Sequence, residues 1–307
     1  MTTKRDFLKL GDLSLAEARQ VLALSARLKR EPKGRRTQLL AGQSVAVVLE
    51  KASTRTRVSF EVGCAQLGAH PVVLGVQGSQ LGRGEPIRDT ARVLSRYCDA
   101  IVYRTSATAR LLEMAEAPVP VLNALTDDGH PIQVLCDIFT IEEQLATSVA
   151  GKRIAFVGDC GSNMARSWLE AAPIFDFHLV LAGPASHAPP AHELAAAGTH
   201  VSQVFDPDGA VAGCDVVNTD VWASMGQEAE AASRLRAFDG WMVDAAMMRT
   251  AKPTSIVLHC LPAHRGEEID EATLEGARSR VWEQAENRLH VQKGLLVWLL
   301  GKAGEVR

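Results

Sequence analysis

Short apolar runs alternate with helical patterns along most of this sequence, and that alternation limits its fold more than any other feature. An apolar run at residues 45–49 is followed by helical apolar spacing at 58–67. The same order returns at 100–104, and again at 153–157 with the helical pattern that follows it. Strands joined through helices pair in parallel, as β-α-β units. We therefore predict an α/β fold with mainly parallel sheets flanked by helices.

The individual elements follow from the period of the apolar residues and from the turn residues between them. Strands are predicted at residues 45–49, 71–74, 100–104, 119–122, 153–157, 178–182, 216–219 and 256–258. Helices are predicted at 14–30, which opens with the capping box Ser14 to Glu17, and at 58–67, 86–96, 131–145, 164–175 and 284–300.

A chain of 307 residues is long for one small domain, and two domains are the natural expectation. The strand and helix pattern restarts near residues 148–152. We predict a first domain at 1–147 and a second at 148–284. The last helix, within 285–307, is a candidate for packing back on the first domain.

Composition excludes several classes of protein. A net charge of −3 gives no support to a nucleic-acid binder, and no apolar run is long enough to span a membrane. The first residues lack the apolar core of a secretory signal. Six scattered cysteines contain no C-x-x-C pair, which argues against structural zinc and favours reduced thiols in a cytoplasm.

The segment Ser53-Thr54-Arg55-Thr56-Arg57 lies where the strand at 45–49 turns into a helix. Free backbone N–H groups and the positive end of the helix dipole converge at such a turn, which suits phosphate. Arginine adds a planar pair of donors that matches phosphate oxygens. An ordinary helix cap is the alternative. Two arginines alternating with two threonines after a buried strand favour an anion site.

Further polar residues follow other predicted strands, where ligands of open parallel sheets bind. They are Arg104, His130, Gln133, Asn163, Asp220 and Cys260. Each alone has an ordinary explanation, such as a surface charge, a turn, a cap or a small buried thiol. Their recurrence in both halves instead predicts one cleft that gathers them between the two domains.

The chemistry of these residues differs between the two halves. Arg104, His130 and Gln133 can donate hydrogen bonds to a carbonyl oxygen on which negative charge builds up. Asp220 and Asn163 suit an ammonium group and the polar end of an amino acid. Phosphate on one side and an amine on the other predict transfer of an acyl-like group from phosphate to amine.

Four motifs, in their order along the chain, resemble the aspartate/ornithine carbamoyltransferase family. They are Ser53-Thr54-Arg55-Thr56-Arg57, His130-Pro131-Ile132-Gln133, Asp220-Val221-Trp222-Ala223-Ser224-Met225-Gly226 and His259-Cys260-Leu261-Pro262-Ala263-His264-Arg265-Gly266. The last two motifs, and the stretch at 78–85, resemble its ornithine branch. The likeness covers nearly the whole chain. Gly129 and the Cys160-Gly161-Ser162 loop depart from the pattern without removing a functional group.

The resemblance implies an enzyme that moves the carbamoyl group of carbamoyl phosphate to the side-chain amine of L-ornithine. The products would be L-citrulline and phosphate, formed through a tetrahedral intermediate, with no metal or other cofactor. It also implies two domains linked by two bridging helices, and a homotrimer in which Gln80 reaches a neighbouring site.

The same resemblance assigns residues to each substrate. Those implied for carbamoyl phosphate are Ser53, Thr54, Arg55, Thr56, Gln80, Arg104, His130, Gln133, Cys260, Leu261 and Arg288. Those implied for ornithine are Asn163, Asp220, Ser224 and Met225. The residues implied to be catalytic are Arg55, Arg104, His130, Asp220 and Cys260.

Three alternatives stay open from the sequence. A sister carbamoyltransferase would use aspartate, an acylated ornithine or putrescine as its acceptor. A nucleotide-binding oxidoreductase is the second, although the loop after 153–157 lacks the G-x-G-x-x-G spacing. The third is a catalytically silent subunit, against which the intact set of polar groups argues.

Overall fold

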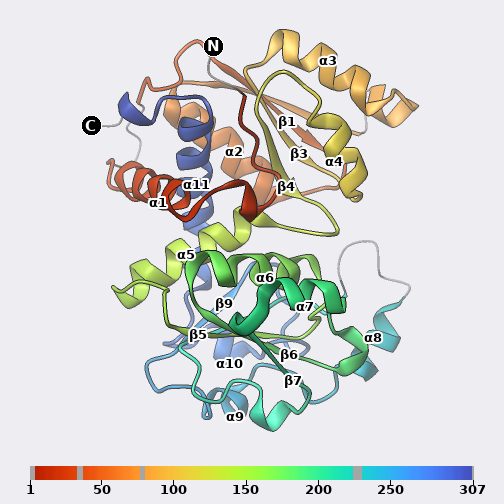
Figure 1. Ribbon diagram of the computed structural model, residues 1–307, viewed down its shortest axis with the longest axis vertical. Coiled ribbons are helices and arrows are strands. Elements are labelled where there is room, and N and C mark those ends of the chain that lie inside the picture. The colour runs from red at the N-terminus through yellow and green to blue at the C-terminus, as the bar shows by residue number, and fades with distance from the viewer. Residues whose placement is uncertain (1–3, 33–36, 77–79, 224–229, 306–307) are drawn as a thin grey trace. The chain divides into compact units, whose positions relative to one another are not determined.

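The chain forms two compact units, and it passes from one unit to the other inside two helices. The computed structural model describes residues 4–32, 37–76, 80–223 and 230–305. Unit 1 contains Met1–Leu135 with Asn287–Arg307, and unit 2 is Cys136–Glu286. Both boundaries fall within helices, namely α5 (Pro131–Leu145) and α11 (Val281–Leu299), which are labelled in Figure 1. The predicted α/β fold with two sheet-based parts is confirmed.

Unit 1 is built on a four-stranded parallel sheet in the order β2-β1-β3-β4. Its strands are β1 (Ser44–Leu49), β2 (His70–Gly75), β3 (Ala100–Arg104) and β4 (Val121–Leu125). Its helices, besides parts of α5 and α11, are α1 (Leu15–Lys29), α2 (Thr54–Leu67), α3 (Ile87–Tyr97) and α4 (Thr108–Met114).

Helices cover both faces of this sheet (Figure 1). On one face, apolar side chains of β1 and β3 pack with α3 and α4 into a single buried cluster. Helices α1, α2 and α11 lie on the other side of the strands. A parallel sheet covered on both faces needs strands that are apolar throughout, which explains the unbroken run of β1.

Unit 2 is built on a five-stranded parallel sheet in the order β7-β6-β5-β8-β9. Its strands are β5 (Arg153–Val157), β6 (His178–Ala182), β7 (Val201–Val204), β8 (Val216–Thr219) and β9 (Ile256–His259). Its helices, besides parts of α5 and α11, are α6 (Asn163–Phe175), α7 (Ala191–Ala197), α8 (Ala231–Ala237), α9 (Ala245–Met248) and α10 (Glu271–Leu274).

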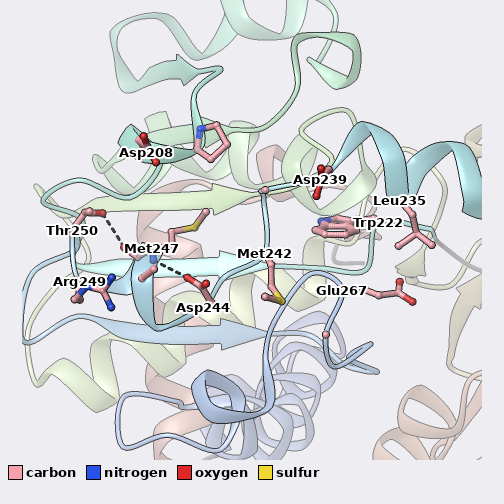
Figure 2. A pocket seen from close by; sticks show the side chains of 14 residues that line it. Asp208, Trp222, Leu235, Asp239, Met242, Asp244, Met247, Arg249, Thr250 and Glu267 are labelled. Carbon is pink, nitrogen blue, oxygen red and sulfur yellow. Dashed lines mark hydrogen bonds between the residues drawn. The ribbon is translucent and has the colours of Figure 1, made fainter.

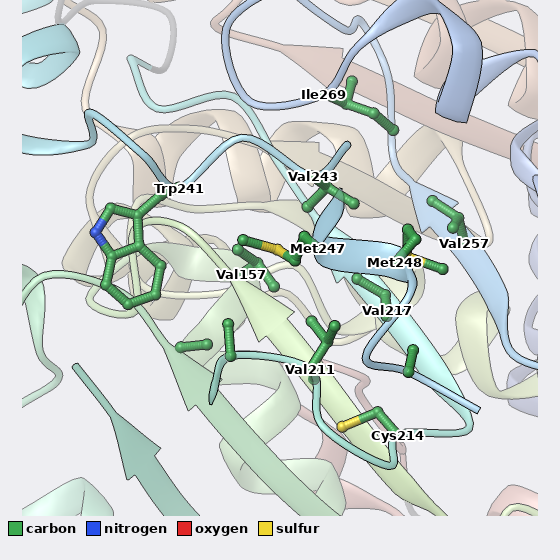
Figure 3. Close-up of a cluster of buried hydrophobic side chains, with 14 of the residues drawn as sticks. Val157, Val211, Cys214, Val217, Trp241, Val243, Met247, Met248, Val257 and Ile269 are labelled. Carbon is green, nitrogen blue, oxygen red and sulfur yellow. The ribbon is translucent and has the colours of Figure 1, made fainter. Parts of the chain in front are cut away.

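One face of this second sheet is closed by an apolar cluster drawn in Figure 3. Val157, Val217 and Val257 point from three neighbouring strands toward Met247 and Met248 of α9. These residues are 9% exposed or less. The cluster holds β5, β8 and β9 together, and the polar residues that follow these strands are thereby held at one edge.

Most predicted elements match the structure, and the differences have local causes. Helix α2 begins at Thr54 rather than at 58, because Ser53 caps it and accepts a hydrogen bond from the Thr56 N–H. Strand β4 begins at Val121 rather than at 119, because Pro120 has no N–H to give to the sheet. Strand β7 was not predicted, since this half-buried edge strand has no apolar run.

Within the described ranges, no helix is both long enough and apolar enough to cross a membrane.

Helices α1 and α11 of unit 1 approach each other closely at Gly294. A Cβ added there would lie 2.9 Å from the carbonyl oxygen of Val21 and would collide with the Ser25 hydroxyl. That hydroxyl is itself occupied, because it donates a hydrogen bond of 2.7 Å to the Val21 carbonyl. The contact therefore requires glycine at this point.

We expect Gly294→Ala to lower the free energy of unfolding by about 1–3 kcal/mol, because overpacking forces the two helices apart. The measurement is urea unfolding followed by circular dichroism. Gly304→Ala is the matched control, since a Cβ at Gly304 meets nothing within 4 Å. Equal midpoints for the two variants would show that the contact is not tight.

Candidate active site

The order of strands marks one edge of each sheet as the place for a site. In unit 1 the chain leaves β1 toward β2 and returns on the other side as β3, so its direction reverses between β1 and β3. In unit 2 the same reversal falls between β5 and β8. Ligands of open α/β sheets bind beyond the carboxyl ends of strands at such points.

The first turn of α2 lies at this edge of unit 1. Ser53 caps the helix, and its hydroxyl also donates to the Thr56 hydroxyl over 2.9 Å. The side chains of Thr54 and Arg55 are exposed. The positive end of a 14-residue helix therefore meets an exposed guanidinium, which together favour an anion.

Arg288 joins this turn from a distant part of the chain. The residue is only 6% exposed; its Nη1 donates to Gln133 Oε1 over 2.6 Å and its Nη2 donates to Thr56 Oγ1 over 3.3 Å. Helices α2, α5 and α11 are thus linked through one cation. Burying a cation costs free energy unless anionic or polar groups surround it, so this arrangement suits a bound anion.

Arg104 and His130 complete the polar edge of unit 1. Arg104 ends β3 opposite Leu49 of β1, and His130 lies in the turn between β4 and α5. Burial lowers the pKa of His130 well below its ordinary value, and the charges of Arg288 and Arg104 lower it further. The imidazole is therefore neutral near pH 7, where it can donate one hydrogen bond without adding charge.

Gln80 stands apart from these residues. It begins a short 3-10 helix, Gln80–Arg83, and its side chain is exposed. An exposed amide on such a turn is available to a second molecule.

In unit 2, Asp220 and Cys260 meet at the carboxyl ends of neighbouring strands. Asp220 directly follows β8 and Cys260 directly follows β9. The Cys260 thiol donates to Asp220 Oδ1 over 3.1 Å, and the Val221 N–H donates to the same oxygen over 2.8 Å. Burial raises the pKa of the Asp220 carboxyl above its ordinary value, although His259, Cys260 and Val221 oppose the shift.

The sequence also predicts four other site residues in this half. Asn163 is the first residue of α6, whose cap is Ser162, and it lies beyond the carboxyl end of β5. Leu261 follows Cys260 and is half-buried. Ser224 and Met225 lie outside the described residues.

His259 and Glu268 form a buried pair that the sequence reasoning did not single out. Their side chains are 0% exposed, and His259 Nε2 lies 3.0 Å from Glu268 Oε1. His259 Nδ1 accepts the Leu261 N–H over 2.9 Å, so Nε2 carries the proton and donates to the carboxylate. Leu261 has a φ of +57°, a strained value for leucine, and this hydrogen bond supports it.

The only sequence signal for this pair is that Glu268 closely follows the His259 to Gly266 motif. Neither periodicity nor composition distinguishes a buried glutamate from a solvated one. Glu268 Oε1 also accepts the His264 N–H over 2.6 Å. The carboxylate therefore organises the whole turn that carries Cys260.

Two groups of side chains within the described residues bring metal-ligating atoms together, and each lies within unit 2. They are Asp220 with His259 and Cys260, and His264 with Glu267 and Glu268. In the first group both ring nitrogens of His259 are already engaged, and Cys260 donates to Asp220. Hydrogen bonds thus occupy the ligand atoms that a metal would need.

Figure 2 shows a pocket of about 630 Å³ in unit 2. Trp222 lines it, together with four carboxylates, those of Asp208, Asp239, Asp244 and Glu267. Asp244 is already engaged as the cap of α9, where it accepts the Met247 N–H. Arg249 also lines the pocket, but four carboxylates outweigh its single positive charge, so the lining opposes an anion and a phosphate group does not belong here.

Two family models cover most of the chain. "Aspartate/ornithine carbamoyltransferase, carbamoyl-P binding domain" matches residues 5–143, and "Aspartate/ornithine carbamoyltransferase, Asp/Orn binding domain" matches 150–299. The ornithine carbamoyltransferase of Sorangium cellulosum is 72% identical over 305 residues, which is 97% of this chain and 98% of that protein. The chain belongs to the aspartate/ornithine carbamoyltransferase family.

Other carbamoyltransferases agree with this assignment. The ornithine carbamoyltransferase of Pelobacter propionicus is 50% identical over 97% of this chain and 99% of its own. The solved ornithine carbamoyltransferase of Pyrococcus furiosus has a TM-score of 0.91 at 42% identity, covering 97% of this chain and 98% of that one. The resemblance drawn from the sequence motifs is thus confirmed, and a carbamoyltransferase fold carries the polar edges described above.

The neutral state of His130 has a measurable effect on stability. An unfolded histidine binds a proton below a pH of about 6.5, whereas the folded protein resists doing so. The stability that His130 contributes by staying neutral is therefore fully present above that pH. It is lost as the pH falls toward the lowered pKa of the folded state.

Between about pH 7 and pH 5 we expect the free energy of unfolding of the wild type to fall by up to about 2 kcal/mol more than that of His130→Gln. The expected slope is about 1.4 kcal/mol per pH unit below about 6.5. Urea unfolding at each pH measures it. His192→Gln is the control, because that side chain is 81% exposed. Parallel pH dependences of wild type and His130→Gln would contradict the assignment.

Proposed function

We propose that this protein transfers the carbamoyl group of carbamoyl phosphate to the side-chain amine of L-ornithine, giving L-citrulline and phosphate. The observation that carries the proposal is the buried contact of Arg288 with Gln133 and Thr56 beside the first turn of α2. It is supported by a relative that is 72% identical and is named ornithine carbamoyltransferase. The matched carbamoyl-P binding domain contains the α2 turn and Gln133.

The phosphate would be held by the first turn of α2 and by Arg288. Ser53, Thr54, Arg55 and Thr56 offer hydroxyls, backbone N–H groups and one exposed guanidinium at a helix N-terminus. Stabilising the phosphate dianion makes it a better leaving group, because negative charge grows on it as the carbamoyl bond breaks.

The carbamoyl carbonyl would be polarised by Arg104, His130 and Gln133, with Cys260 and Leu261 at the carbamoyl end. The neutral amine attacks the carbonyl carbon and gives a tetrahedral intermediate whose oxygen is negative. Each donor aimed at that oxygen contributes about 3 kcal/mol to lowering the barrier. Collapse of the intermediate breaks the bond between the carbamoyl carbon and the phosphate oxygen, and the departing phosphate takes up the proton that the nitrogen loses.

Ornithine would be held by Asn163, Asp220, Ser224 and Met225. Its side-chain amine must attack in the neutral form, and an aliphatic amine has a pKa of about 10 in water. Asp220 would by itself favour the ammonium, so we assign it and Cys260 to orienting the amine. The raised pKa of Asp220 supports this role, because a carboxyl group that protonates more readily favours the ammonium form of the amine less strongly.

The proposal extends to assembly and location. We place the enzyme in a cytoplasm, in arginine metabolism, and the six free thiols support a reducing compartment. We propose a homotrimer in which the exposed Gln80 reaches a neighbouring site. Exposed apolar side chains on α2 and α3 support an interface, namely Val58, Val62, Val93 and Tyr97.

Arg55 gives the most direct test of the phosphate assignment. We expect Arg55→Ala to lower the turnover number for citrulline formation by about 100-fold or more, since it removes a cation from the departing phosphate. Its exposed side chain predicts an unchanged circular dichroism spectrum and melting temperature. Arg57→Ala is the control, because Arg57 is exposed and pairs with Glu61 at 3.4 Å. Near-normal turnover by Arg55→Ala would refute the assignment.

The acceptor is tested with a panel of amines. With carbamoyl phosphate fixed, we expect kcat/KM for L-ornithine to exceed that for L-aspartate, an Nα-acylated ornithine and putrescine by at least about 100-fold, because each alternative leaves polar groups of the site unmatched. Phosphate release and carbamoylated product are measured together. Preference for another amine would move the protein to a sister activity within the same family.

A further inference from the structure

Glu50 occupies the junction between the β1 strand and the turn that leads to Ser53. Its backbone N–H donates to the Arg104 carbonyl over 2.9 Å, which continues the pairing of β1 with β3 by one more residue. Its side chain is 11% exposed. A carboxylate this buried needs several donors, and its described donors all lie within residues 103–110, between the end of β3 and α4.

Two of these donors flank Arg104 in the sequence. The Tyr103 hydroxyl donates to Glu50 Oε1 over 2.8 Å, and the Thr105 hydroxyl donates to Glu50 Oε2. Residues 103 and 105 share one side of the extended chain and residue 104 points to the other. The two oxygens of one carboxylate thus clamp the backbone on both sides of Arg104.

The third donor is Arg110 of α4. Its Nε donates to Glu50 Oε2 over 3.1 Å, and its Nη2 donates to Oε1, so the pair is bidentate. The Arg110 side chain is 41% exposed, so it balances the carboxylate while remaining in contact with water.

The carboxylate stays ionised despite its burial. Burial raises the pKa of Glu50, but hydrogen bonds from Arg110, Thr105 and Tyr103 outweigh it and lower the pKa below the ordinary value. Burial, together with the contact to Glu50, raises the pKa of Tyr103, which therefore remains a donor. The clamp keeps its charge throughout the neutral range.

The strand needs such a clamp at this point. The pairing of β3 with β4 shifts register here, because Tyr103 pairs with Asn123 whereas Arg104 pairs with Leu125, so the ladder is irregular on that side of Arg104. The Thr105 N–H bonds to the Leu125 carbonyl beyond the shift.

We propose that Glu50 is a positioning residue, whose carboxylate holds Tyr103 and Thr105 so that Arg104 presents its guanidinium to the carbamoyl carbonyl. Glu50 acts through Arg104 and touches no substrate. The inference rests on the proposed carbamoyl transfer and adds to it a specific support for one of its donors. A clamp that only stabilises the sheet would leave the affinity and reactivity of the folded enzyme unchanged.

The test is Glu50→Gln, which keeps the shape of the side chain and removes its charge. We expect kcat/KM for carbamoyl phosphate to fall about 10-fold, equivalent to about 1.4 kcal/mol, with KM for ornithine within about twofold of wild type. The inhibition constant of inorganic phosphate should also stay within about twofold, because the α2 turn, not Arg104, holds that group. Tyr103→Phe, which removes one of the donors, should show a smaller effect of the same kind.

Asp99→Asn is the matched control, because Asp99 accepts the Ser44 N–H over 2.7 Å at the opposite end of β1. We expect it to leave all three constants unchanged. A lower melting temperature of Glu50→Gln with wild-type constants would overturn the positioning role. Equal weakening of phosphate and carbamoyl phosphate would overturn it too, since the whole turn would then have moved. Wild-type protein that forms no citrulline would instead defeat the proposed function itself.

Discussion

Parallel pairing of two strands that are neighbours in the sheet but not consecutive along the chain is the constraint on which each unit depends. β1 pairs with β3, and β5 pairs with β8. At each pairing the order in which successive strands are added to the sheet reverses. The connections after the two strands therefore run in opposite directions and leave a crevice at the carboxyl ends of these strands. Ser53 and Arg104 are brought to that edge in unit 1 by the first pairing. Asn163 and Asp220 are brought to the corresponding edge in unit 2 by the second.

Buried charge is the second theme of the molecule, and it is managed by pairing each charge with aimed partners. Arg288 is held by Gln133 and Thr56, and Glu50 by three donors. Glu268 is held by His259 and by a backbone N–H. Burying such a charge costs free energy, and the cost is smaller when its hydrogen-bond partners are already in place. The cost is repaid where a charged substrate must be bound or a charge must be stabilised in the transition state.

The two units place different electrostatic demands on their ligands. Unit 1 offers guanidiniums, a helix N-terminus and a neutral imidazole, all of which favour an anion. Unit 2 offers a carboxylate with a raised pKa and a thiol that donates to it, which suits an amine more than an anion. A transferase that moves a group from a phosphate to an amine needs both environments, and their separation on two sheets lets each be tuned independently.

The class of fold, most strand positions and the residue types at the carboxyl ends of the strands can be predicted from the sequence, because periodicity and turn chemistry are encoded within a few neighbouring residues. The cap that starts α2 and the proline that precedes β4 are local signals of the same kind. Which charges are buried, in contrast, depends on how distant parts of the chain fold together. Arg288 contacts Thr56, which lies 232 residues away in the sequence. His130 is neutral because it is buried and because Arg288 and Arg104 lie near it. The side chain of Glu268 is fully buried against His259. A pKa and a partner depend on the groups that surround a side chain in space, and no short stretch of sequence contains that information.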